Sequence, residues 1–128
     1  PTILLADDES AMLDRVRRLL ESEFRIVGTA LDGEALLAAA ERLKPDVILA
    51  DISMPVLNGF EAARRLKSSF PETRIIFLTV HEEPTVVTEA LAIGVKGYVI
   101  KRSAAQDLIA AIRAVLQGRS FVSPGVSL

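Results

Sequence analysis

Short apolar runs alternate along this chain with longer stretches in which apolar residues recur every three or four positions. The runs predict strands that are buried on both faces, and the longer stretches predict helices with one apolar side. Strands are expected at residues 2–6, 25–30, 46–50, 74–79 and 96–100, and helices at 10–22, 33–43, 58–69, 84–93 and 104–117. Strict alternation of this kind is typical of an α/β fold, a doubly wound parallel sheet with helices on both faces.

Residues that favour helix ends occur where the pattern changes. Asp32 and Asn58 are expected to cap the second and third helices at their amino ends. Pro84 suits the first turn of the fourth helix. Gly94 and Gly118 stand where the fourth and fifth helices are predicted to stop. These capping and helix-ending residues therefore support the element boundaries that the apolar pattern predicts.

The 128 residues are half hydrophobic and indicate one domain. The chain has no cysteine, which excludes disulfides and thiolate sites, and its net charge of −2 gives no basic footprint for nucleic acid. Its apolar runs are too short for a membrane helix and no signal peptide is visible, so a cytoplasmic location is expected. We expect residues 1–118 to form the domain. Residues 119–128 are expected to start a linker to a further domain that this chain does not contain.

Polar side chains follow four of the predicted strands. Asp7 and Asp8 follow the first strand, Asp51 the third, Thr79 closes the fourth and Lys101 follows the fifth. Ligands of open parallel sheets bind outside the carboxyl ends of the strands, where these residues are expected to meet. Considered alone, a threonine in a strand reflects β propensity and a lysine after a strand is a solvated end. Their joint placement with three carboxylates indicates metal-assisted phosphoryl chemistry.

The acidic residues suit a hard cation. Three carboxylates at one edge must share protons or bind a positive ion, and an all-oxygen set favours Mg²⁺. We therefore interpret Asp7 and Asp8 as metal ligands, and Asp51 as both a shared ligand and the phosphoryl acceptor. The alternative for Asp7 and Asp8 is a helix cap. For the single tyrosine, Tyr98, the alternative to a functional role is an aromatic residue at the sheet edge, and the single histidine, His81, is interpreted as a loop residue.

Four separated motifs resemble those of bacterial response-regulator receiver domains. They are Leu5-Ala6-Asp7-Asp8-Glu9, Asp51-Ile52-Ser53-Met54-Pro55 with Asn58-Gly59, Leu78-Thr79, and Gly97-Tyr98-Val99-Ile100-Lys101. The resemblance implies a flavodoxin-like (βα)5 fold with strand order 2-1-3-4-5. It also implies that Asp51 accepts a phosphoryl group from a sensor histidine kinase. Asp7, Asp8, Asp51 and the backbone carbonyl of Ser53 would surround Mg²⁺ or Mn²⁺. Thr79 and Lys101 would contact the phosphoryl group, and Thr79 and Tyr98 would act as coupled switch residues.

Two further stretches and the ending resemble the receivers of LuxR/NarL/FixJ-type regulators. They are Ala90 to Tyr98, Ala111 to Gly118, and Phe121-Val122-Ser123-Pro124. In that group a helix-turn-helix DNA-binding domain follows the linker, which implies a transcription-regulating domain in a longer protein. A homodimer is a further expectation, because two-fold pairing is the commonest route to reading paired half-sites. No DNA binding and no membrane binding are expected of these 128 residues alone.

Two residues depart from the pattern common in receivers. Arg102 stands where proline often follows the lysine, so a trans Lys101–Arg102 bond is expected. Val80 is bulkier than the alanine that often follows Thr79, which would narrow access to Asp51.

Three alternatives remain. An aspartate-nucleophile phosphohydrolase would need an acid where Ser53 stands, and an FMN-binding protein would need a phosphate-cradling loop where Asp7 and Asp8 stand. The third alternative is a receiver used only as an interaction module. We expect a phosphoacceptor and not a turnover enzyme, with slow loss of its own phosphoryl group.

Overall fold

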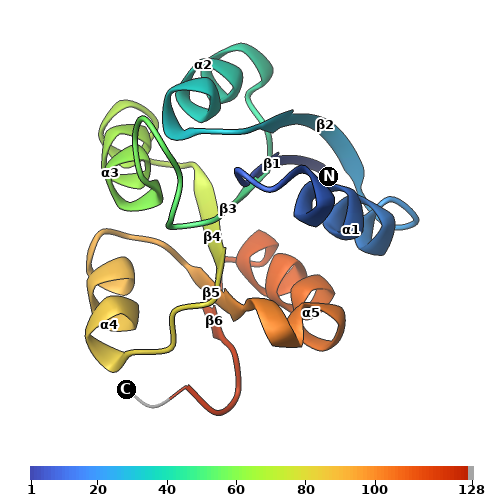
Figure 1. The fold of residues 1–128 in the computed structure, drawn as a ribbon, viewed down its shortest axis with the longest axis vertical. Helices are drawn as coiled ribbons and strands as arrows, with labels where there is room; N and C mark the ends of the chain where they lie inside the picture. The colour runs from blue at the N-terminus through green and yellow to red at the C-terminus, as the bar shows by residue number, and fades with distance from the viewer. Residues whose placement is uncertain (127–128) are drawn as a thin grey trace.

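The computed structural model describes residues 1–126 as a six-stranded parallel sheet covered by five α-helices (Figure 1). The strands are β1 Thr2–Ala6, β2 Arg25–Ala30, β3 Val47–Ala50, β4 Arg74–Thr79, β5 Gly97–Ile100 and β6 Phe121–Val122. The helices are α1 Ser10–Leu20, α2 Gly33–Leu43, α3 Gly59–Ser69, α4 Pro84–Ala92 and α5 Ala104–Leu116, with a short 3₁₀ turn at Lys101–Ser103. Within residues 1–126, no helix is both long and apolar enough to cross a membrane.

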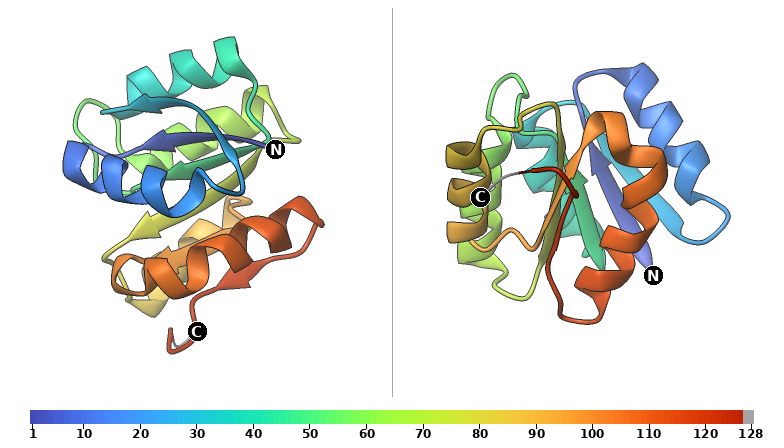
Figure 2. Two further views of the ribbon diagram at one scale, coloured as in Figure 1. Left: turned by 90° about the vertical axis from the view of Figure 1, so that its right-hand side faces the viewer. Right: turned by 90° about the horizontal axis from the view of Figure 1, so that it is seen from below.

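The strand order is β2-β1-β3-β4-β5-β6. Helices α1 and α5 cover one face of the sheet, and α2, α3 and α4 cover the other (Figures 1 and 2). The predicted fold class and the order 2-1-3-4-5 are therefore confirmed, with one strand added at the β5 edge. The added strand lies in the segment that was expected to start a linker, so residues 121–122 belong to the sheet.

The two faces of the sheet have separate cores. Ile3 and Leu5 pack with α1 and α5, while Leu4 and Ala6, which point the other way, pack with α2 and α3. β3 behaves in the same way, and all four of its residues are buried. Burial on both faces explains why the strands are continuous apolar runs without polar alternation.

The predicted helix ends are confirmed. Asp32 accepts a hydrogen bond from the Ala35 amide at 2.8 Å, and Asn58 accepts one from the Glu61 amide at 3.0 Å. Pro84 lies in the first turn of α4, and Gly94 follows that helix with a φ of 97°. Side-chain caps thus mark where α2 and α3 begin, next to the loops at the carboxyl edge of the sheet, whereas α1, α4 and α5 begin without a side-chain cap hydrogen bond.

Two features of the backbone bear on that edge. No cis peptide bond occurs in the described part of the chain, so the Lys101–Arg102 bond is trans as predicted. Val56, in the loop between β3 and α3, has a φ of 68°, a conformation that side chains branched at Cβ rarely adopt.

Candidate functional site

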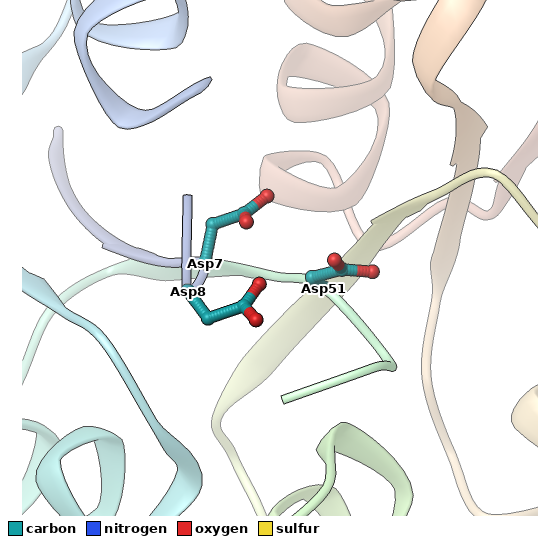
Figure 3. Close-up of side chains that lie close together, drawn as sticks. All are labelled: Asp7, Asp8 and Asp51. Carbon is teal, nitrogen blue, oxygen red and sulfur yellow. The ribbon is translucent and has the colours of Figure 1, made fainter. Parts of the chain in front are cut away.

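The three aspartates predicted to meet do so at the carboxyl ends of β1 and β3. These strands are neighbours in which Ala6 pairs with Ala50, so the residues that follow, Asp7 and Asp51, leave the sheet side by side. One carboxylate oxygen from each of Asp7, Asp8 and Asp51 lies within 4.8 Å of the others (Figure 3). Asp7 and Asp51 are buried, whereas Asp8 is exposed. The cluster therefore has one side open to solvent.

Asp7 and Asp8 do not cap α1 with their side chains. The capping position is Glu9, which makes no side-chain cap hydrogen bond. Asp7 instead accepts a hydrogen bond from the Glu9 amide at 2.9 Å, which turns the chain sharply after β1. This turn holds the Asp7 carboxylate at the end of the strand, and the capping alternative is not supported by the structure.

Lys101 is the positive charge of the site. Its Nζ lies 2.9 Å from Asp7 Oδ2 and 3.0 Å from Asp51 Oδ2, with Glu9 further away at 3.7 Å. The Lys101 side chain is only 13% exposed. Because the ammonium bridges the two buried carboxylates, it offsets part of their mutual repulsion.

Burial and pairing shift the pKa values of this group. Burial raises the pKa of Asp7, and the hydrogen bonds from the Glu9 amide and Lys101 only partly oppose that effect. Burial alone would lower the pKa of Lys101, but its hydrogen bonds to Asp7 and Asp51 outweigh this and raise it. Three carboxylate side chains face a single ammonium group in this cluster, an arrangement that favours the binding of a further cation.

Thr79 is the last residue of β4 and Tyr98 lies in β5, and both are fully buried. The Thr79 hydroxyl accepts a hydrogen bond from the His81 amide at 3.2 Å. The Tyr98 hydroxyl donates to the His81 carbonyl at 2.8 Å, and burial, followed by the charges of Glu83 and Asp51, raises the pKa of Tyr98 to about 12. β5 lies between β4 and β6, so Tyr98 is inside the sheet and not at its edge.

His81 has a larger part in the site than the sequence indicated. Its Nε2 lies 3.0 Å from the Ser53 hydroxyl, so the loop after β4 is tied to the loop after β3. The His81 backbone hydrogen-bonds to both hydroxyl groups: its amide donates to Thr79 and its carbonyl accepts from Tyr98. The only signal in the sequence was a lone histidine two residues after Thr79, and the contact to Ser53 spans 28 residues.

Two other charged residues join the surroundings of the site. Arg102 forms an ion pair with Glu82, which links the residues after β5 to the loop after β4. Glu9 Oε1 lies 3.7 Å from the Lys101 ammonium, a contact that the sequence did not predict. Both side chains of the Arg102–Glu82 pair are exposed, whereas in the Lys101–Glu9 pair only Glu9 is exposed.

The hollow found beside Asp7 is too small for a large organic ligand. The hollow beside Asp7 holds about 10 Å³, room for about one water molecule. A larger hollow of about 400 Å³ is lined by Asp46 and Arg74 at the amino ends of β3 and β4. It therefore lies at the opposite end of the strands from Asp7 and Asp51. A flavin needs several hundred Å³ next to the phosphate site. The FMN-binding alternative is therefore not supported.

Comparison with known proteins agrees with this geometry. A family model described as the response regulator receiver domain matches residues 3–113. The transcriptional regulatory protein DegU of Brevibacillus brevis is 38% identical over 127 residues, which cover 98% of this chain and 54% of DegU. The chain thus spans little more than half the length of the curated relatives it matches.

Solved structures are similar over nearly the whole chain. A two-component response regulator of the LuxR family from Aurantimonas sp. SI85-9A1 has a TM-score of 0.94 at 31% identity, covering 98% of this chain and 91% of that one. The isolated receiver domain of RcsB from Salmonella enterica serovar Typhimurium, solved with the phosphomimetic BeF₃⁻, has a TM-score of 0.91 at 30% identity, covering 98% and 94%. The chain belongs to the response regulator receiver domain family, among relatives of the LuxR/NarL type.

Proposed function

We propose that Asp51 is the phosphoryl acceptor of this receiver domain and that the domain signals through the acyl phosphate formed there. One observation carries the proposal. The buried Asp51 carboxylate lies both within 4.8 Å of the Asp7 and Asp8 oxygens and 3.0 Å from the Lys101 ammonium. Phosphoryl transfer needs positioning and charge neutralisation more than covalent help, and this arrangement supplies both.

Asp7, Asp8, Asp51 and the Ser53 backbone carbonyl are the proposed ligands of Mg²⁺ or Mn²⁺. The donors are all oxygen, and their spacing suits an ion that takes oxygen ligands at about 2.1 Å and keeps several waters. When bound, the ion would neutralise negative charge on a phosphoryl oxygen. The Ser53 amide donates to Asp51 Oδ1 at 3.4 Å, so the loop that carries the carbonyl already approaches the acceptor.

The transfer itself would be carried by residues of this chain. An Asp51 carboxylate oxygen attacks the phosphorus of a phosphohistidine on the sensor kinase, the P–N bond breaks, and its electron pair returns to the imidazole. Lys101 would then donate to a phosphoryl oxygen. Thr79 now accepts a hydrogen bond from His81, and its hydroxyl proton can be donated to another phosphoryl oxygen.

Receiver domains are signalling proteins and not turnover enzymes. We propose that this domain loses its phosphoryl group slowly, and that Thr79 and Tyr98 change position together when Asp51 is modified. In a longer protein the output would be a DNA-binding domain, as in relatives named transcriptional regulatory proteins, with homodimers as a candidate assembly. The 128 residues alone should not bind promoter DNA specifically. A linker to such a domain would begin after β6 and not at residue 119.

Intact mass spectrometry tests the acceptor. With a small phosphodonor and Mg²⁺, the wild type should gain the mass of one phosphoryl group, which hydroxylamine removes because it is an acyl phosphate. Asp51→Asn should gain nothing, whereas Asp14→Asn, which changes an exposed carboxylate on α1, should behave as the wild type does. Stable labelling of Asp51→Asn, or a hydroxylamine-resistant adduct in the wild type, would sink the assignment.

A further inference from the structure

The segment that follows α5 returns along the free edge of β5. The Phe121 amide donates to the Lys96 carbonyl, and the Ser123 amide donates to the Tyr98 carbonyl, both at 2.9 Å. Figure 2 shows this segment in red beside the sheet. We call residues 121–126 the exit segment. It lies on the strand that carries Tyr98 and that ends immediately before Lys101.

Ser123 fixes the exit segment at its centre. Its side chain is buried, and its hydroxyl accepts a hydrogen bond from the Ile100 amide at 3.0 Å while donating to Asp107 Oδ2 at 2.9 Å. The last paired residues of β5 and β6 are Tyr98 and Val122, and the Ser123 amide makes one further backbone bond to β5. The Ile100 amide then bonds to the Ser123 hydroxyl where a continued strand would offer a backbone carbonyl. The donor and an acceptor position of one hydroxyl are both used, and one partner is a carboxylate, which strengthens such a bond.

The residue held by Ser123 is the one from which the site lysine projects. Ile100 directly precedes Lys101, whose Nζ bridges Asp7 and Asp51. Asp107 lies in the first turn of α5, the helix that begins just after Lys101. Ser123 thus ties the end of β5 to the start of α5, with Lys101 between the two points it holds.

We propose that Ser123 is a positioning residue for Lys101. Through Ser123, ligand binding at Asp51 is coupled to the stability of the hydrogen bonds that join the exit segment to β5. The proposal rests on the proposed function of Asp51. A phosphoryl group at Asp51 needs the Lys101 ammonium in one place, so its binding selects the state in which Ile100 is held by Ser123. Coupling is reciprocal: a ligand at Asp51 tightens the exit segment, and a seated exit segment strengthens ligand binding.

The packing of the exit segment supplies a second connection. Val122 and Val126 pack against the core that contains Tyr98, on the α4 side of the sheet, whereas Phe121 packs on the α5 side. The segment therefore contacts both halves of the core next to the proposed switch residue.

Amide hydrogen exchange of the wild-type chain tests the coupling without a mutation. We would compare exchange with Mg²⁺ alone and with Mg²⁺ plus beryllofluoride. The Phe121 and Ser123 amides should exchange about fivefold or more slowly with beryllofluoride, while amides of β2, at the opposite edge, should not change. Unchanged or faster exchange at Phe121 and Ser123, with beryllofluoride bound at Asp51, would overturn the proposal. If beryllofluoride did not bind, both this proposal and the proposed function would fail.

Variants test the positioning role. Ser123→Ala should weaken beryllofluoride binding about fivefold, and Ser123→Thr, which keeps a hydroxyl, should restore most of it. Ser120→Ala changes an exposed serine and should have no effect. Phe24→Leu changes a core residue beside β2 and controls for loss of stability alone. Equal affinities for Ser123→Ala and Phe24→Leu would show that Ser123 serves only the stability of the fold, and would contradict the proposal.

Discussion

Replacing Val56 with glycine is expected to stabilise the domain. Val56 has a φ of 68°, and the Leu57 amide donates to the Pro55 carbonyl at 2.7 Å across it. A γ-turn is closed by a hydrogen bond between residues i and i+2, and the form in which the central residue has a positive φ is rare and strained. The side chain is 79% exposed, so little packing compensates for the strain.

The size of the effect follows from three opposing contributions. Relief of backbone strain is worth roughly 1–3 kcal/mol. Glycine gives back about 0.4–1 kcal/mol, because it adds conformational freedom to the unfolded chain. With one-fifth of the valine buried, lost burial costs about 0.3–0.6 kcal/mol of the roughly 1.5–3 kcal/mol for a fully buried side chain. The net gain in the free energy of unfolding is therefore about 1 kcal/mol.

Urea unfolding measures this gain. With a denaturant slope of about 2 kcal/mol/M, the midpoint should rise by about 0.5 M. Val80→Gly is the matched control, because Val80 is also exposed in a loop at this edge but has no positive φ. It should lower the midpoint slightly. If Val56→Gly lowered the midpoint as much as Val80→Gly does, the strain argument would be refuted.

Three other changes test the geometry of the site. Gly59→Ala should destabilise the domain by roughly 3 kcal/mol and slow phosphorylation, because the alanine Cβ would lie 2.3 Å from the Asp51 carbonyl oxygen. A wild-type rate of phosphorylation in this variant would contradict the close approach. Tyr98 is the only tyrosine, so an ultraviolet titration should give a pKa of about 12. Because folding raises this pKa from 10.0, the folded state disfavours the phenolate, and stability should fall as the pH rises from 10.0 to about 12. Tyr98→Phe should remove that dependence and cost about 1 kcal/mol through the hydrogen bond to His81, and an unaltered alkaline transition would refute the assignment. Asp8→Ala should weaken Mg²⁺ binding by roughly tenfold or more in calorimetry while barely changing stability, since Asp8 is exposed; equal Mg²⁺ affinity would remove it from the ligand set.

The sequence predicted those parts of the fold that depend on local chemistry. Continuous apolar runs such as Val47–Ala50 are buried on both faces, and Asp32 and Asn58 cap helices through bonds three residues away. The site followed from the same information. Once strands are parallel and adjacent, Asp7 and Asp51 must leave the sheet together, whatever their separation in the chain.

What the sequence did not predict depends on side chains that meet across long separations. Phe121–Val122 forms a strand by pairing with the edge of β5, and the Ser123 hydroxyl bonds to Ile100 and Asp107, which are 23 and 16 residues away in the chain. Two half-buried residues that begin three positions after Gly118 carry no periodic signal that separates such a strand from a linker. Phe121 and Val122 pair with β5, the strand that ends immediately before Lys101. The coupling that we propose between Asp51 and residues 121–126 therefore depends on bonds between distant residues, and not on the motifs that identify the site.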